Sequence, residues 1–131
     1  MASILLVDDE VLVRGALLQA LQSKGHEVVC ATNGVEGMAR FAERQFDLVI
    51  TDIIMPDKEG IGMIMEMRRI TPAIKIIAIS GGGRTGNVEF LRMAQQLGAM
   101  ATLRKPIRLS DFLKVVNDCL AGNQAVDRAA G

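Results

Sequence analysis

Short apolar runs rich in β-branched residues alternate five times with segments of helical periodicity along this chain. The runs predict strands at residues 4–7, 27–31, 48–51, 74–79 and 100–103. Strands that are apolar on both sides and separated by helices form a parallel sheet covered on both faces. Because crossover connections are right-handed, the expected fold is α/β, a doubly wound five-stranded parallel sheet with five helices.

The helices are predicted from apolar spacing and from residues that cap helix ends. They are expected at residues 11–24, 33–44, about 60–70, 87–97 and 110–120. Gly25 is a plausible end of the first helix. Asn33 can cap the second, with Glu36 three residues on as a capping-box partner. Ser110 or Asp111 can cap the last. One domain is therefore expected over residues 1–121, with a frayed C-terminal tail at 122–131.

Charge and apolar content exclude several classes of function. The formal net charge is zero and the basic residues are scattered, so direct nucleic-acid binding is not expected. No apolar run approaches the roughly 20 residues that a membrane span needs, so no membrane insertion is expected and the cytoplasm is the expected location. Cys30 and Cys119 are isolated. They are interpreted as buried free thiols of a reducing compartment, with a disulfide or a reactive thiol as the alternative.

Polar residues that can carry chemistry follow the predicted strands. In open α/β sheets, ligands bind beyond the carboxyl ends of the strands, and those positions hold Asp8, Asp9, Asp52, Ser80 and Lys105. Three crowded carboxylates would repel and raise one another's pKa. Mg²⁺ resolves this conflict, because it prefers oxygen ligands and keeps several waters, and Lys105 supplies a second positive charge. The sequence therefore predicts a magnesium site at this edge of the sheet.

This set of residues suits the storage of a phosphoryl group. A carboxylate can attack phosphorus and form an aspartyl phosphate, and phosphoryl transfer needs mainly positioning and charge neutralisation. Mg²⁺, Lys105 and the Ser80 hydroxyl would cover the phosphoryl oxygens. The only histidine, His26, is expected on the surface at the opposite end of the sheet. Since no group is poised as a general base for hydrolysis, the chain is not expected to be a turnover enzyme.

Several short motifs follow one another in a fixed order. They are ILLVDDE at residues 4–10, DLVITDIIMPDKEG at 47–60, IIAIS at 76–80, Gly98-Ala99 and Lys105-Pro106. In this order and spacing the chain resembles the receiver domain of two-component response regulators, of the stand-alone single-domain type. The resemblance runs from about residue 3 to residue 120, nearly the whole chain, and implies the flavodoxin-like receiver fold.

The resemblance also implies roles for individual residues. Asp52 would be the phosphoacceptor and Lys105 would contact the phosphoryl group, with Ser80 as the switch hydroxyl. Mg²⁺ would be held by Asp8, Asp9, Asp52 and the backbone carbonyl of Ile54. The implied donor is a histidine kinase or a histidine phosphotransfer protein. Phosphorylation would change the face formed by the fourth helix, fifth strand and fifth helix, and so the binding of an unknown downstream protein.

Three positions depart from the family pattern. Thr102 stands where receivers usually have an aromatic residue, so an aromatic switch coupled to Ser80 is absent. Residues 81–83 are three glycines, which are entropically costly to order. This loop is therefore expected to be mobile until Mg²⁺ or a phosphoryl group binds. Ile54 and Gly82 offer no polar side chain to orient an attacking water, so the phosphoryl group is expected to be long-lived.

The sequence allows alternative interpretations. The pattern Gly81-x-Gly83-x-x-Gly86 satisfies a dinucleotide fingerprint, but it lies in the fourth strand–helix unit and lacks the acid about twenty residues on. A pseudo-receiver that is never phosphorylated, or the receiver part of a larger transcriptional regulator, would also carry these motifs. Met63, Met65 and Met67 cannot share one helix face. Core filling is the expected role for most of them, and an adaptable docking surface is the alternative.

Overall fold

The computed structural model describes residues 2–53, 60–80, 92 and 95–122. Its strands are β1 (Ser3–Val7), β2 (Glu27–Ala31), β3 (Leu48–Asp52), β4 (Ile76–Ser80) and β5 (Ala101–Arg104). They form one sheet in the order β2-β1-β3-β4-β5, and each neighbouring pair is parallel. Strand order that runs both ways from β1 is the doubly wound arrangement, and the prediction of an α/β parallel sheet is confirmed.

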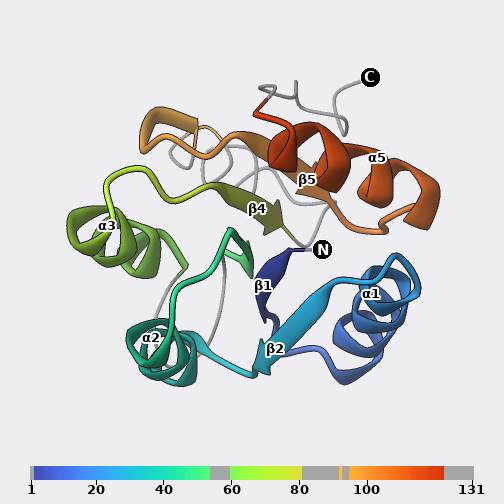
Figure 1. Cartoon of the computed structure of the whole chain (residues 1–131), viewed down its shortest axis with the longest axis horizontal. Helices are drawn as coiled ribbons and strands as arrows, with labels where there is room; N and C mark the ends of the chain where they lie inside the picture. Colours follow the sequence, from blue (N-terminus) through green and yellow to red (C-terminus); the bar gives the residue numbers. More distant parts are fainter. Residues whose placement is uncertain (1, 54–59, 81–91, 93–94, 123–131) are drawn as a thin grey trace.

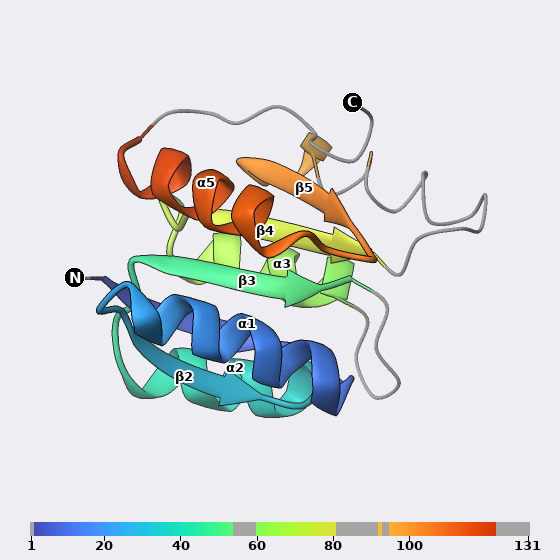
Figure 2. The same cartoon turned by 90° about the vertical axis from the view of Figure 1, so that its right-hand side faces the viewer.

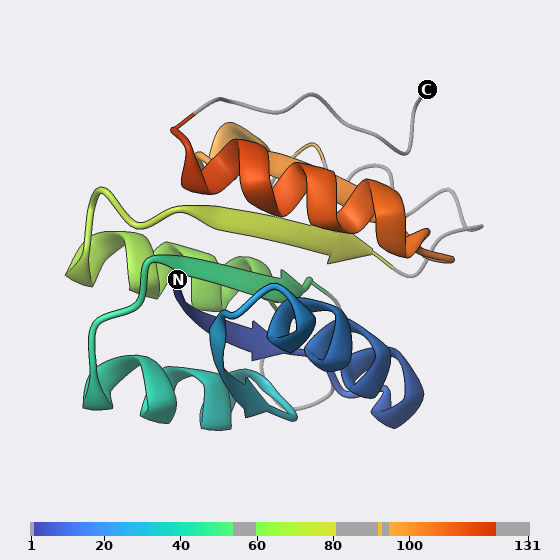
Figure 3. The ribbon, with the colours of Figure 1, turned by 45° about the vertical axis from the view of Figure 1, so that its right-hand side comes forward.

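Helices cover both faces of this sheet. They are α1 (Val11–Ser23), α2 (Gly34–Glu43), α3 (Gly60–Ile70) and α5 (Leu109–Leu120). Helices α1 and α5 lie against one face, and α2 and α3 lie against the other (Figures 1 and 3). The helix predicted at residues 87–97 falls largely outside the described residues.

The core has two layers because side chains alternate across the sheet. On one face, Leu5 and Val7 pack with Met63 and Ile64. On the other face, Ile4, Leu6 and Ile50 pack with residues of α1 and α5, among them Leu17, Leu21 and Phe112. These positions are almost wholly removed from water. Burial on both faces explains why the strands are apolar at every position rather than at every second one.

Two predicted helix ends are found in the structure. Gly25 has a positive φ of 84° and its N–H donates to the Gln22 carbonyl at 2.9 Å, which ends α1. The Asn33 side chain accepts from the Glu36 N–H at 2.8 Å and caps α2. The Glu36 carboxylate reaches one residue further back than a capping box requires, and accepts from the Thr32 N–H at 2.6 Å.

The predicted start of the last helix was wrong. Helix α5 begins at Leu109, with Arg108 at the N-cap and no side-chain cap, so neither Ser110 nor Asp111 caps it. The first turn is closed by the Phe112 N–H, which donates to the Arg108 carbonyl at 2.9 Å while its ring enters the core. A later start would leave this amide without its partner. Asp111 lies instead in the first turn, where its negative charge interacts favourably with the positive end of the helix dipole.

His26 and the cysteines lie away from the carboxyl ends of the strands. His26 directly precedes β2, at the opposite end of the sheet as expected, but it is half-buried and its Nδ1 accepts from the Ala2 N–H at 3.2 Å. Burial lowers the pKa of His26. Both cysteines are free, with Cys119 fully buried and Cys30 partly so. Burial raises the pKa of Cys119 to about 11, which suits the interpretation as an inert apolar residue.

The methionines of α3 give a matched test of the core. Met63 and Met67 are fully buried, whereas Met65 is 56% exposed, so the expectation that they face different ways is confirmed. We expect Met63→Ala to lower the free energy of unfolding by about 2–5 kcal/mol, because it leaves a cavity. Met65→Ala should change it by less than about 0.5 kcal/mol. Urea unfolding measures both, and similar losses for the two variants would contradict this packing.

Candidate functional site

The carboxyl ends of the strands lie at one edge of the sheet, together with the N-termini of α1 and α5 (Figure 2). Asp8 follows β1, and its N–H donates to the Ala31 carbonyl of β2 at 3.1 Å. Asp52 is the last residue of β3, and the following residue, Ile53, donates its N–H to the Ile79 carbonyl of β4 at 2.9 Å. Backbone hydrogen bonds to neighbouring strands therefore fix both carboxylates, and both side chains are buried.

Lys105 joins these carboxylates. Its N–H donates to the Ser80 carbonyl at 2.8 Å, which ties the loop after β5 to the end of β4. The Lys105 Nζ lies 3.0 Å from Asp52 Oδ2 and 3.1 Å from Asp8 Oδ2. It also forms an ion pair with Glu10 Oε1. Residues that are far apart in the sequence thus form one charged cluster of Asp8, Glu10, Asp52 and Lys105.

The charges of this cluster do not balance. Three carboxylates and one ammonium leave a formal charge of −2 (three minus one). Burial raises the pKa of Asp8, opposed by the Glu10 N–H that donates to Asp8 Oδ1 at 2.8 Å and by Lys105. Burial alone would lower the pKa of Lys105, but its hydrogen bonds to Glu10 and Asp52 outweigh it and hold that pKa above its ordinary value. The site therefore favours the arrival of a cation.

The donor atoms fit a hard divalent cation. One oxygen each from Asp8, Glu10 and Asp52 lie within 4.8 Å of one another. Within the described residues, Ser80 Oγ is buried and makes no hydrogen bond, and the buried Asp8 Oδ2 has only the Lys105 ammonium beside it, 3.1 Å away. A buried oxygen without a hydrogen-bond partner costs free energy unless a ligand satisfies it. A set of carboxylate oxygens with room for water is the environment that Mg²⁺ takes in proteins.

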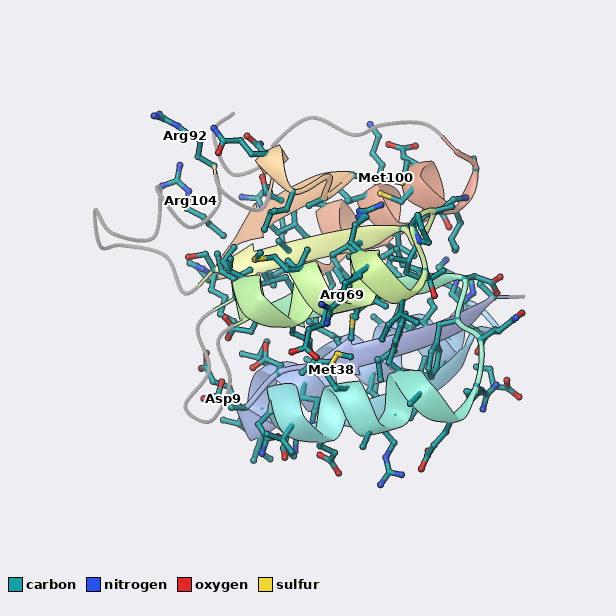
Figure 4. The ribbon with its side chains drawn as sticks, turned by 90° about the vertical axis from the view of Figure 1, so that its left-hand side faces the viewer. Asp9, Met38, Arg69, Arg92, Met100 and Arg104 are labelled. Carbon is teal, nitrogen blue, oxygen red and sulfur yellow. The ribbon has the colours of Figure 1, made fainter. Side chains whose placement is uncertain are left out.

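One predicted metal ligand, Asp9, is not part of this cluster. Asp9 is exposed and lies at the outer edge of this end of the molecule (Figure 4), and it is absent from the group of carboxylates whose oxygens lie together. The Ile54 carbonyl falls outside the described residues. Glu10 was not predicted as a site residue. The signal that could have found it is its position at the N-cap of α1, where a long acidic side chain can cross to the loop that holds Lys105.

Ser80 and Thr102 lie on the same face of the sheet. Ser80 ends β4 and pairs with Arg104, while Thr102 pairs with Ala78, two residues before Ser80. Both side chains are fully buried. The Gln95 Nε2 donates to Thr102 Oγ1 at 3.4 Å, so a small polar residue with a glutamine partner occupies the position where the family pattern has an aromatic ring.

The burial of Asp8 predicts a gain in stability when its charge is removed. Since the pKa of Asp8 is raised above 3.8, the native state binds the proton more tightly, and stability falls as pH rises between 3.8 and the native pKa. We expect Asp8→Asn to raise the free energy of unfolding at neutral pH by about 1 kcal/mol, to remove this part of the pH dependence and to weaken stabilisation by Mg²⁺. Urea unfolding across pH, with and without Mg²⁺, measures all three. A less stable variant at neutral pH would contradict the argument.

Comparison with known proteins gives a consistent result. The family model of the response regulator receiver domain matches residues 4–117. The chain is 34% identical to the chemotaxis protein CheY of Bacillus subtilis over 118 residues, which cover 89% of this chain and 96% of that protein. It is 35% identical to the DNA-binding transcriptional regulator NtrC of Azospirillum brasilense over 122 residues. That match covers 93% of this chain but spans only about a quarter (25%) of the NtrC protein.

Solved structures agree with the sequence comparison. A CheY-like receiver domain protein from Methanospirillum hungatei superposes with a TM-score of 0.84 at 30% identity, covering 93% of this chain and 95% of the other. The chemotaxis response regulator CheY4 of Vibrio cholerae gives 0.80 at 28% identity, covering 89% and 97%. Among the described residues, no helix has the length and apolar character to cross a membrane. With the family match over most of its length and the acidic cluster at its strand ends, the chain belongs to the response regulator receiver domain family.

Proposed function

We propose that this chain is a phosphoacceptor switch that takes a phosphoryl group from a phosphohistidine donor onto Asp52, with Mg²⁺ at the acidic cluster. The observation that carries the proposal is the position of Asp52. Its carboxylate is buried at the end of a central strand, beside Asp8 and within 3.0 Å of the Lys105 ammonium. A carboxylate in such a place has an anchored backbone, a fixed counter-charge and a divalent-cation site beside it.

Each residue has a distinct task in the proposed transfer. A carboxylate oxygen of Asp52 forms a bond to phosphorus while the bond from phosphorus to the imidazole nitrogen of the donor breaks, and the electron pair stays on that nitrogen. Lys105 pairs with a phosphoryl oxygen. The Ser80 hydroxyl, which has no hydrogen-bond partner among the described residues, donates to another. Asp8 keeps the cation site negative. Bound Mg²⁺ would supply positive charge against the phosphoryl oxygens.

Partners follow from the same proposal. The donor would be a histidine kinase or a histidine phosphotransfer protein, and the phosphorylated chain would bind a downstream protein.

We propose residues 1–121 as the receiver domain and 122–131 as a tail, in line with the end of the family match at residue 117 and of α5 at Leu120. A receiver of single-domain type is the first candidate, with a match that covers 96% of CheY. The match to a quarter of NtrC supports a receiver segment of a larger regulator as the second candidate.

Intact mass spectrometry tests the proposal. The chain is incubated with phosphoramidate and with phosphorylated histidine proteins, each with and without Mg²⁺. We expect one added phosphoryl group that requires Mg²⁺, and its slow decay would fit the prediction from Ile54 and Gly82, which lie outside the described residues. Failure with both small and protein donors would favour a pseudo-receiver that binds partners without phosphorylation.

A further inference from the structure

Glu10 makes a contact that neither the fold nor the helix end requires. It occupies the N-cap position of α1, yet its side chain makes no capping hydrogen bond to that helix. The carboxylate instead crosses to the loop after β5 and pairs with the Lys105 Nζ, 95 residues away in sequence. A cap would satisfy one of the helix's unbonded N–H groups. The Glu10 side chain therefore pairs with Lys105 and does not cap its own helix.

The three carboxylates around Lys105 differ in their access to water. The side chain of Asp8 is 0% exposed, that of Asp52 is 5% exposed and that of Glu10 is 55% exposed. The Lys105 side chain itself is only 10% exposed, so its ammonium has little contact with water and is surrounded mainly by these three carboxylates. Glu10 is thus the outermost of the three anions and the one that stands between Lys105 and solvent.

A phosphoryl oxygen must displace one of these partners if Lys105 is to contact it. Asp52 is the proposed acceptor and is consumed by the transfer. Separating Asp8 from Lys105 would leave a buried carboxylate without its cation, which is costly. An exposed carboxylate such as Glu10 can exchange its partner for water at little cost. Glu10 is therefore the contact that can break when the phosphoryl group arrives.

We propose that Glu10 is a positioning residue, which holds the Lys105 ammonium at the mouth of the site in the unphosphorylated chain and gives it up to the incoming phosphoryl group. This rests on the proposed function of Asp52. The contact lowers the rate of phosphorylation, because an oxygen of the donor's phosphoryl group competes with the Glu10 carboxylate for the same ammonium. The role as a partner of Lys105 also explains why the Glu10 side chain does not cap α1.

The test uses two variants of Glu10 and one matched control. Glu10→Gln removes the charge and keeps the length, whereas Glu10→Asp keeps the charge and shortens the side chain by one methylene. Glu43→Gln is the control, because Glu43 is also an exposed glutamate (58%) in an ion pair, with Arg40 at 3.1 Å, and lies on another helix. Urea unfolding checks that all variants remain folded, and Mg²⁺ is kept saturating so that weaker metal binding does not limit the rate.

Two readouts distinguish a direct contact between Glu10 and Lys105, here called the tether, from a general effect of negative charge near the site. In the unphosphorylated chain, the ¹⁵N resonance of the Lys105 ammonium should shift in Glu10→Gln and Glu10→Asp, and stay unchanged in Glu43→Gln. The rate of phosphorylation by phosphoramidate should rise by up to about fivefold in both Glu10 variants, the factor expected for an exposed ion pair. The control should keep the wild-type rate.

The outcomes are distinguishable. A wild-type chain that accepts phosphoryl groups, with Glu10→Gln at the same or a lower rate, overturns the role of Glu10 and leaves the proposed function standing. Wild-type behaviour of Glu10→Asp in both readouts shows that negative charge alone matters, and overturns the tether. A wild-type chain that accepts no phosphoryl group from any donor removes the proposed function, and the role of Glu10 with it.

Discussion

Replacing Asp52 by asparagine is expected to abolish the phosphoryl adduct completely. The amide keeps the shape of the carboxylate, but its oxygen carries no negative charge and is a poor nucleophile toward phosphorus. The neighbouring groups stay in place, because Lys105 still contacts Asp8 and Glu10. Intact mass after incubation with a donor and Mg²⁺ should show one added phosphoryl group for the wild type and none for Asp52→Asn.

The best control for this variant lies just before the same strand. Asp47 precedes β3, at the opposite end of the sheet, where its Oδ2 accepts from the Ser3 N–H at 2.8 Å. Asp47→Asn makes the same chemical change outside the acidic cluster and should leave the adduct unchanged. An adduct that persists in Asp52→Asn and still needs Mg²⁺ would move the acceptor to another carboxylate, with Asp8, Asp9 and Glu10 as the candidates.

Repeating patterns account for what could be predicted of the fold. Apolar runs of strand length recur with helical segments between them, and the strand ends then bring Asp8, Asp52 and Lys105 together. The boundaries were less accurate. The fourth strand was predicted from residue 74, but Ile74 is buried without sheet pairing, since its N–H donates to the Thr71 carbonyl at 3.0 Å in a turn. Apolar character reports burial, whereas a strand also needs a neighbour for its backbone.

Side-chain direction accounts for what could not be predicted of the site. The sequence places Asp8, Asp9 and Glu10 in one run, and nothing in that run says which of them face Lys105. Asp8, directly after β1, is buried, whereas the side chain of Asp9 is exposed. Glu10 contacts Lys105 because its longer side chain can reach across from the N-cap of α1. That outcome depends on how α1 leaves the strand, which is a tertiary property.

The close packing of Gly60 is a second feature that only the structure reveals. The sequence predicts a helix from about residue 60, and in the structure Gly60 is the first residue of α3 and packs directly on the end of β3. Its N–H donates to the Ile53 carbonyl at 2.9 Å. A Cβ placed on Gly60 would lie 2.4 Å from the Asp52 carbonyl oxygen and 2.4 Å from the Ile53 Cα, well inside van der Waals contact. Both neighbours are backbone atoms, so no side chain can rotate away to make room.

Gly60→Ala should therefore be among the most damaging single-methyl changes in this chain. We expect it to lower the free energy of unfolding by about 3 kcal/mol, at the upper end of the usual cost of overpacking. Gly62→Ala is the matched control, because a Cβ there meets nothing within 4 Å in the same helix. That change should be neutral or should stabilise the chain by up to about 1 kcal/mol, since alanine favours helix over glycine. Urea unfolding of the two variants measures the difference.

The same substitution connects packing to the proposed chemistry. The new methyl group can be accommodated by a shift of α3 or by a shift of the Asp52 and Ile53 backbone. In the second case Asp52 Oδ2 leaves its position 3.0 Å from Lys105. The folded fraction of Gly60→Ala should thus accept phosphoryl groups more slowly than wild type, while Gly62→Ala keeps the wild-type rate. Equal stability and equal rates for the two alanine variants would show that the end of β3 is not held as the structure places it. A loss of stability with an unchanged rate would instead show that α3, rather than Asp52, gives way.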